Sequence, residues 1–309
     1  MIFSDQSLYH IYGYLKEKLK VLSDHEIIEF EVINPDISNE FSGTLISISG
    51  KKYIYRPFKA WVDLAEILHC KILMPKDLGN NRILIRYKPL NMSKSWHNHS
   101  GVHITERYGQ DSDFSKIFKF EEPYFLSGYI RSLGEISVRK GMKILNLGIN
   151  RGDEFEIFSE FFSTISDSLF FTGIDHCSSA LKFAKKRFSS EHYKFIEEDI
   201  SKISDLNLQK HDVLISVGTL QSPDINGNDI FRFVIQNILK KSGSVILGFP
   251  NSRYIDCEVV YGAKTKNYTE SNLNLLIKDI NFYKRYLQQH GYKVITFGKY
   301  YIFLVAEKK

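Results

Sequence analysis

The stretch KILNLGINRGDEFEI, residues 143–157, places a short apolar run before two glycines and an amphipathic segment. The run 144–147 predicts a buried strand, and Gly148 predicts a sharp turn after it. A helix is predicted to begin near Asp153, because Phe155, Phe158, Phe161 and Phe162 follow at helical spacing. Glycine lets a ligand approach the backbone closely, and the first turn of a helix offers unpaired N–H groups. The stretch therefore predicts a strand–turn–helix with a ligand site at its turn. The alternative is an ordinary turn of an α/β core.

An acidic residue follows the next predicted strand. Asp175 ends the apolar run 170–174 and lies 23 residues beyond Gly152. A carboxylate at that place can accept hydrogen bonds from ribose hydroxyls. The dinucleotide fingerprint G-x-G-x-x-G would need glycines where this chain has Asn150 and Asp153. The observed spacing, G-x-x-x-G, disfavours a nicotinamide or flavin dinucleotide as the ligand.

Strands and helices alternate from residue 143 to the end of the chain, which predicts a parallel sheet with helices on both faces. The predicted strands are 144–147, 170–174, 193–196, 212–217 and 244–248, and the predicted helices are 178–188, 229–240 and 271–290. Two further strands, 293–297 and 300–306, are joined by so short a turn that they must be antiparallel.

The glycine turn, Asp175, an acid after the third strand and the terminal hairpin together resemble the class I S-adenosylmethionine (SAM)-dependent methyltransferases, over about residues 113–309. The resemblance implies an α/β, Rossmann-like sheet of seven strands closed by an antiparallel terminal hairpin, with SAM as the cofactor. The family usually has an acid where this chain has Asn146, and often a glycine in place of Asn150.

The resemblance also implies which residues hold the cofactor. Asp175 would accept hydrogen bonds from both ribose hydroxyls, Asp199 would lie near the adenine amino group, and Ile200 would pack on the ring. The segment before the glycine turn would lie over the pocket, so that Tyr124 or Glu122 would border it. The implied cofactor-binding residues are Asn146, Gly148, Asn150, Gly152, Asp175, His176, Asp199, Ile200 and Val217.

Residues 1–95 are predicted to form a small α+β accessory domain in front of a catalytic domain at 96–309, which starts with a helical lead-in at 113–135. The expected helices are 6–20 and about 61–68, and the expected strands are 27–33, 43–49, 51–56 and 82–87. The accessory domain has no recognised catalytic motif, and binding of a substrate or partner is the role expected for it.

Composition narrows the class of protein. The chain has 309 residues, of which 43% are hydrophobic, so it can build a sizeable core. It has no apolar run long enough for a membrane helix and no signal-peptide pattern at its start, so no membrane partner is expected. Three widely spaced cysteines indicate a reducing compartment, the cytoplasm, and disfavour a cysteine-based zinc site.

Three histidines, His97, His99 and His103, lie within seven positions. Imidazoles so close together could bind a metal or include a general base. No carboxylate or cysteine accompanies them at a matching spacing, so we predict no metal site. The catalytic residues are not identified from the sequence.

The substrate prediction rests on charge and on one stretch. Residues 251–309 contain 10 Lys or Arg and 5 Asp or Glu, whereas 1–250 contain 31 of each. The stretch 249–268 follows a predicted strand, where such sheets bind ligands, and is rich in Tyr, Asn, Arg and Lys. The predicted substrate residues are Tyr124, Asn251, Arg253, Tyr254, Tyr261 and Lys264.

We therefore predict a SAM-dependent methyltransferase that modifies structured RNA, such as tRNA or rRNA. The stretch after 212–217 lacks the Asn/Asp-Pro-Pro-aromatic motif of enzymes that methylate base amino groups, and no suitable cysteine follows it. Two alternatives stay open. One is a small-molecule O- or N-methyltransferase, whose N-terminal domain would be a lid or dimer contact. The other is a SAM-binding protein without catalytic activity.

Overall fold

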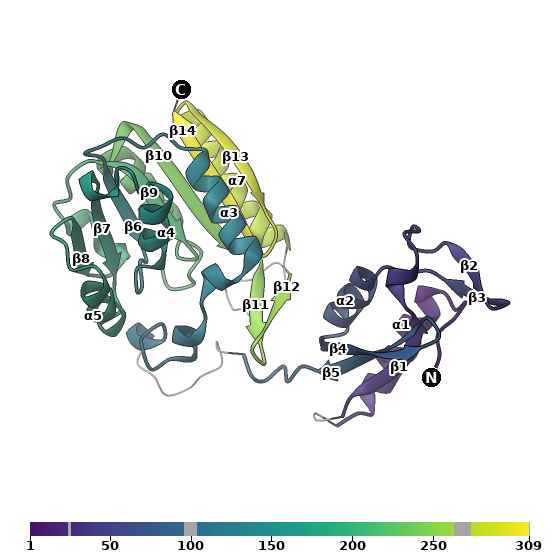
Figure 1. Ribbon diagram of the computed structural model, residues 1–309. Helices are drawn as coiled ribbons and strands as arrows, with labels where there is room; N and C mark the ends of the chain where they lie inside the picture. The colour runs from purple at the N-terminus through teal and green to yellow at the C-terminus, as the bar shows by residue number, and fades with distance from the viewer. Residues whose placement is uncertain (24–25, 96–103, 263–272, 309) are drawn as a thin grey trace. The chain divides into compact units, whose positions relative to one another are not determined.

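The structure is a computed structural model, which describes residues 1–23, 26–95, 104–262 and 273–308. The chain divides into two compact units (Figure 1). Unit 1 comprises Met1–Ser95 and Tyr254–Val260, and unit 2 comprises Trp96–Arg253 and Tyr261–Lys309. Within the described ranges, no helix is both long and apolar enough to cross a membrane.

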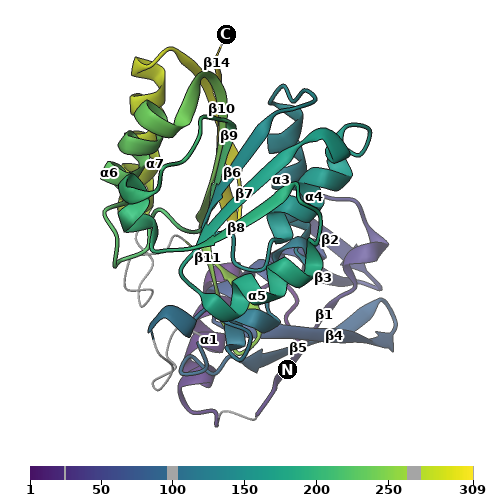
Figure 2. The same cartoon turned by 90° about the vertical axis from the view of Figure 1, so that its left-hand side faces the viewer.

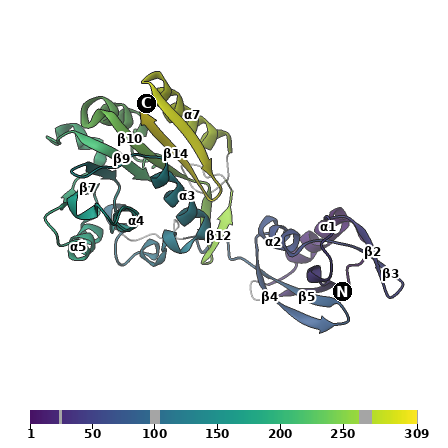
Figure 3. The same ribbon diagram turned by 45° about the horizontal axis from the view of Figure 1, so that its top comes forward.

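Unit 1 is built on a three-stranded antiparallel sheet of order β1-β5-β4, made of β1 (Ile28–Ile33), β5 (Arg82–Pro89) and β4 (Cys70–Gly79). Helices α1 (Leu8–Lys20) and α2 (Phe58–Ile67) cover one face of this sheet (Figure 3). Their apolar side chains pack on alternate residues of the strands, such as Phe30 opposite Ile85. A separate hairpin joins β2 (Leu45–Ile48) to β3 (Lys51–Ile54).

Two parts of the chain differ from the sequence-based prediction. Strand β4 was not predicted, because it contains Pro75 and several exposed polar residues. It is an edge strand, and its pairing with β5 shifts register between Leu73 and Lys76, which accommodates the proline. No strand was predicted in the stretch 249–268, but it contains β11 (Ser252–Ile255) and β12 (Glu258–Tyr261), which pair as a small sheet.

Unit 2 contains a seven-stranded sheet of order β13-β14-β10-β9-β6-β7-β8. Five strands are parallel neighbours: β6 (Lys143–Leu147), β7 (Phe170–Asp175), β8 (Tyr193–Glu197), β9 (His211–Val217) and β10 (Leu239–Pro250). Strand β14 (Tyr301–Lys308) pairs antiparallel with both β10 and β13 (Tyr292–Gly298). This arrangement confirms the predicted Rossmann-like sheet closed by an antiparallel hairpin.

Helices cover both faces of this sheet (Figure 2). Helices α3 (Pro123–Gly134), α4 (Asp153–Phe161) and α5 (Ser178–Arg187) pack on one face, and α6 (Gly227–Phe233) and α7 (Leu273–Gln289) pack on the other. Each face therefore has its own apolar core. The predicted helix 229–240 is shorter than expected, because α6 continues as a π-helical turn, η8 (Val234–Ile238), and β10 begins at Leu239.

The strand order creates a crevice at one edge of the sheet. Strand β6 lies between β9 and β7, so the chain leaves β6 toward β7 and later returns to its other side as β9. Open α/β sheets bind ligands at the carboxyl ends of their strands, where the order reverses in this way. The fold thus locates a candidate site at the ends of β6, β7 and β9.

Candidate functional site

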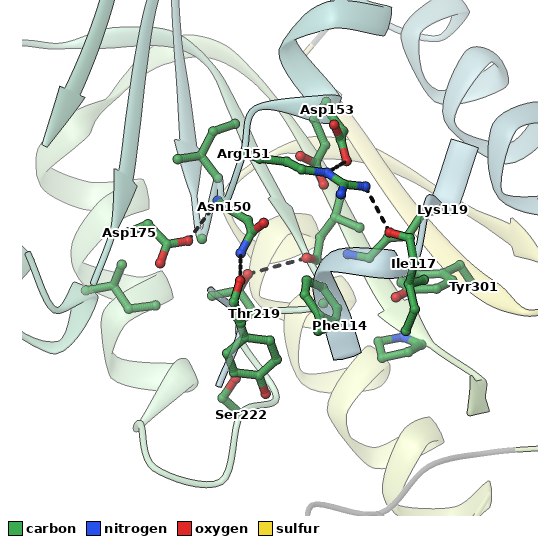
Figure 4. A pocket seen from close by; sticks show the side chains of 18 of the residues that line it. Phe114, Ile117, Lys119, Asn150, Arg151, Asp153, Asp175, Thr219, Ser222 and Tyr301 are labelled. Atoms are coloured by element: carbon green, nitrogen blue, oxygen red, sulfur yellow. Dashed lines mark hydrogen bonds and ion pairs between the residues drawn. The ribbon is translucent and has the colours of Figure 1, made fainter. Parts of the chain in front are cut away.

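A pocket lies at that edge of the sheet (Figure 4). Its walls come from the ends of β6, β7 and β9, from the first turn of α4 and from the segment that precedes α3. The residues that line it are Tyr108, Phe114, Ile117, Lys119, Phe120, Gly148, Ile149, Asn150, Arg151, Asp153, Glu154, Asp175, His176, Ile200, Val217, Gly218, Thr219, Ser222, Pro250 and Tyr301.

The turn after β6 has left-handed backbone at three positions, Gly148, Asn150 and Gly152. Gly148 has φ +75°, and a Cβ atom there would overlap the side chain of Thr219. Its N–H donates to the carbonyl of Ile174 at 2.8 Å, which ties the turn to β7. Asn150 has φ +50°, a conformation that asparagine tolerates better than most residues. The asparagine therefore preserves the backbone path that a glycine would allow.

Asp175 ends β7 and is 7% exposed. Its Oδ2 accepts a hydrogen bond from the backbone N–H of Asn150 at 2.8 Å, and its Oδ1 accepts one from that of Cys177 at 2.9 Å. Burial raises the pKa of this carboxyl group, although both N–H donors oppose the shift. Each carboxylate oxygen retains acceptor capacity beyond these bonds, so the group can still receive donors from a ligand.

The structure brings six of the nine predicted cofactor residues together in the pocket wall. They are Gly148, Asn150, Asp175, His176, Ile200 and Val217. Gly152 instead begins α4, and a Cβ atom at that position would overlap the ring of Phe188. Asn146 is 1% exposed within β6, and in the described part of the chain neither of its amide atoms has a hydrogen-bond partner.

Asp199 is also outside the pocket wall. Its Oδ1 accepts from the backbone N–H of Ser201 at 2.8 Å and so caps the short helix η7 (Ile200–Asp205). Partial burial acts to raise the pKa of Asp199, but the Ser201 N–H and hydroxyl outweigh it and the pKa is lowered. The residue thus stabilises the turn that brings Ile200 to the pocket.

Residues 104–121, here called the strap, supply one whole wall of the pocket (Figure 4). Arg151 attaches the strap to the turn after β6. Its Nη1 donates to the carbonyl of Ser115 at 2.7 Å and its Nη2 to that of Ile117 at 2.9 Å. Its Nε also pairs with Asp153 at 2.7 Å, and its guanidinium lies over the Phe118 ring at 4.1 Å.

Further hydrogen bonds attach the strap elsewhere on the same edge. Asn150 Nδ2 donates to the carbonyl of Tyr108 at 2.8 Å. The Ser179 hydroxyl, in the first turn of α5, donates to Glu106 at 2.5 Å, and this bond lowers the pKa of the Glu106 carboxyl group. The sequence analysis expected the segment before the glycine turn to lie over the pocket, but it named Tyr124 and Glu122 and not these strap residues. The helix expected at 113–135 is an α-helix only over α3 (Pro123–Gly134), and the strap before it forms short 3-10 turns.

The strap and the first turn of α4 together contribute a group of charges to the pocket wall. The Lys119 ammonium lies over the rings of Phe114, Phe125 and Tyr301 at 5.5, 6.0 and 5.7 Å. Glu154, in the first turn of α4, is 6% exposed, and burial raises its pKa to about 7 although Lys119 opposes the shift. These residues were also missed, since only tertiary packing brings them together.

Glu122 lies near this group without lining the pocket. Burial raises its pKa to about 7, with Lys119 opposing the shift. Neither of its carboxylate oxygens has a hydrogen-bond partner among the residues that the structure describes. The negative charge of Glu122 in turn contributes to raising the pKa of Tyr301, after burial, which is the main cause.

Three of the predicted substrate residues gather around the turn between β13 and β14. The Lys299 ammonium lies over the rings of Tyr124, Tyr300 and Tyr261 at 4.7, 4.7 and 5.5 Å. Asn251 is buried and donates from Nδ2 to the carbonyl of Lys299 at 2.9 Å. We call Tyr124, Tyr261, Lys299 and Tyr300 the tyrosine–lysine cluster. None of its residues lines the described pocket.

The other predicted substrate and metal-site residues fall elsewhere. Arg253 lies in β11 within unit 2, and Tyr254 belongs to unit 1. Lys264 lies outside the described residues, as do His97, His99 and His103.

No protein-family model matches the sequence, and no curated protein matches it either. Solved structures do align with part of the chain. A TehB-like SAM-dependent methyltransferase from Corynebacterium glutamicum is 16% identical, covering 59% of this chain and 88% of its own, with a TM-score of 0.39. A SAM-dependent methyltransferase from Aquifex aeolicus is 16% identical over 63% of this chain and 97% of its own, with a TM-score of 0.45.

The plantazolicin methyltransferase BpumL, solved in complex with S-adenosylhomocysteine (SAH), is 13% identical over 60% of this chain and 84% of its own, with a TM-score of 0.43. Two of these three structures are described as SAM-dependent methyltransferases, and the third is a methyltransferase that holds SAH. At these identities the alignments describe a likeness in fold.

Proposed function

We propose that this protein is a SAM-dependent methyltransferase whose cofactor binds in the pocket of unit 2. One observation carries the proposal. The buried carboxylate of Asp175 and the glycine turn at Gly148 line the same pocket, at the point where the strand order reverses. A nucleoside needs both features, because its ribose hydroxyls require acceptors and its attached group must pass close to the backbone.

The residues of the pocket fit the cofactor. Asp175 would accept hydrogen bonds from the ribose hydroxyls, Ile200 would offer an apolar surface to the adenine, and Gly148 leaves room beside the backbone. When bound, SAM supplies a methyl group activated by its positively charged sulfur. The protein's part is to align the acceptor with that methyl group and exclude water, for which the strap provides a wall.

We propose RNA as the acceptor. The tyrosine–lysine cluster supports this choice, because Tyr124 and Tyr261 are 51% and 46% exposed and surround a cation. Exposed aromatic rings stack on unpaired bases, and a nearby ammonium attracts phosphate. The excess of basic residues in 251–309, with 10 Lys or Arg against 5 Asp or Glu, agrees with that role.

A small-molecule acceptor is the second candidate. Residues 1–95 contain 13 Lys or Arg and 11 Asp or Glu, which is a weaker basic balance than nucleic-acid-binding domains typically have. In that case the N-terminal domain would act as a lid or dimer contact.

The three cysteines are all free thiols, which supports a reducing compartment such as the cytoplasm.

Calorimetric titration with SAM, SAH and NAD tests the cofactor. We expect micromolar binding of SAM and SAH, no binding of NAD, and loss of SAM binding in Asp175→Ala with the fold retained. Unchanged SAM binding in that variant would contradict the site assignment.

Methyl transfer from labelled SAM to total RNA then tests the acceptor. If RNA is the acceptor, we expect the affinity of the protein for RNA to fall steeply as the salt concentration rises. SAM binding without turnover on any acceptor would indicate a non-catalytic binder.

A further inference from the structure

A ligand with an ammonium group needs a negatively charged side chain in the pocket, and in this protein that charge cannot come from the strand residue that is usually acidic. The strand residue that would be acidic in the resembling family is Asn146, which has no charge. It is 1% exposed and does not line the pocket. A counter-charge for the ligand therefore has to come from another side chain.

Of the acidic residues in the pocket wall, two already bind other groups of the protein. The acidic residues are Asp153, Glu154 and Asp175. Asp153 is already paired, with Oδ2 on Arg151 at 2.7 Å and Oδ1 on Arg187 at 2.5 Å. Asp175 uses both oxygens to hold backbone N–H groups and faces the ribose position. Within the described residues, the Glu154 carboxylate makes no ion pair and accepts a hydrogen bond only from its own backbone N–H, while the charges of Lys119 and Arg151 act on it electrostatically.

The cationic side chains of the pocket wall also differ in whether they already bind other groups of the protein. The wall contains Lys119, Arg151 and His176. Arg151 uses Nε, Nη1 and Nη2 to hold Asp153 and the strap. His176 lies next to Asp175, at the nucleoside end. In the described part of the chain, Lys119 contacts only aromatic rings through its ammonium, whose three N–H groups remain available to a ligand.

We propose that Glu154 and Lys119 together form a subsite for a zwitterionic amino-acid group, with Glu154 binding its ammonium and Lys119 its carboxylate. The inference rests on the proposed function, since the methionine portion of SAM is such a group. A buried carboxylate beside a partly buried ammonium complements this charge pattern, and charged hydrogen bonds are strongest in a pocket that excludes water.

The position of the pair agrees with the length of such a ligand. Asp175 ends β7, Gly148 follows β6, and Gly218 follows β9. A Cβ atom placed on Gly218 would lie 3.8 Å from the Lys119 Nζ, so the ammonium sits at the end of β9. Neighbouring strands are about 4.8 Å apart, so the ribose position and Lys119 are separated by roughly 10 Å across β6. SAM spans a similar distance from ribose to carboxylate.

Three ligands separate the contributions of the two residues. SAM has both charged groups, decarboxylated SAM lacks the carboxylate, and 5′-methylthioadenosine lacks the whole amino-acid portion. In Glu154→Gln we expect the affinity for SAM and for decarboxylated SAM to fall about tenfold or more, while 5′-methylthioadenosine binds as before. In Lys119→Met we expect a similar loss for SAM alone. Calorimetry measures all nine combinations of wild type or variant with ligand.

Glu156→Gln is the matched control, because Glu156 lies on the same helical turn but pairs with Arg187 outside the pocket wall. Its affinity for each ligand should equal that of the wild type. Retained binding of 5′-methylthioadenosine shows that a variant is folded. A loss shared equally by all three ligands, or unchanged SAM affinity in Glu154→Gln, would overturn the subsite and leave the proposed function standing. Failure of the wild type to bind any of the ligands would overturn both.

Discussion

The two ends of the pocket differ in how their polar groups are used. At the end formed by β6 and β7, the groups already hold one another: Asp175 binds two backbone N–H groups, and Arg151 binds Asp153 and two strap carbonyls. At the end formed by α4 and β9, the side chains of Glu154 and Lys119 make no hydrogen bond to another residue among those that the structure describes. The first end is organised before a ligand arrives, whereas the second keeps its charges available to one.

This difference has a consequence for stability. Polar groups that bind each other stabilise the fold, while a buried carboxylate that binds no other side chain destabilises it. The raised pKa of Glu154, about 7, is the sign of that cost. We expect such unpaired charges to lower the stability of the ligand-free protein and to increase its affinity for the ligand.

The largest effect is expected at the organised end, for Gly148→Ala. Alanine would be strained at φ +75° and would overlap Thr219, so we expect the free energy of unfolding to fall by about 3–4 kcal/mol. Gly141→Ala is the control, because Gly141 has φ +81° but open space around it, and should lose only about 1 kcal/mol. Chemical denaturation measures both. Equal losses would mean that Thr219 yields and that close packing at this turn is unimportant.

The next effect concerns Glu154 and is pH-dependent. Its pKa is about 7 in the folded protein and 4.5 ordinarily, so the folded state retains the proton longer and stability falls as pH rises from about 4.5 to 7. Glu154→Gln should remove this fall and be more stable than wild type above pH 7, by up to about 3 kcal/mol. Thermal unfolding at pH 4.5 and pH 8 measures it, with Glu156→Gln as control. A difference that is the same at both pH values would contradict the account.

The smallest effect is expected for the strap. Arg151→Met removes its attachment to Ser115 and Ile117, so stability should fall by about 1–2 kcal/mol and hydrogen exchange in the strap should increase. Arg187→Met is the matched control, since Arg187 also pairs with Asp153 but does not hold the strap. Exchange mass spectrometry over residues 104–121 compares them. Equal protection in both variants would show that the strap is held by its other contacts.

The sequence was sufficient to predict the sheet of unit 2 because its strands and helices are amphipathic or apolar at regular spacing. The apolar run 144–147, the turn at Gly148 and the acid at Asp175 became β6, its turn and the end of β7. Strand β4 was missed, since an edge strand tolerates Pro75 and exposed polar residues and so loses the alternating pattern.

Within the candidate site, the sequence by itself determined the residues that shape the turn and the carboxylate beside it, because local backbone geometry requires them. Only the tertiary structure decided which charges face the ligand. Asn146 is buried inside β6, and Glu154 and Lys119, 35 positions apart in the chain, lie close together in the pocket wall. A charged side chain can bind the ligand only if it lines the pocket and is not already hydrogen-bonded within the protein. Both conditions depend on tertiary contacts, which the spacing of residues in the sequence does not determine.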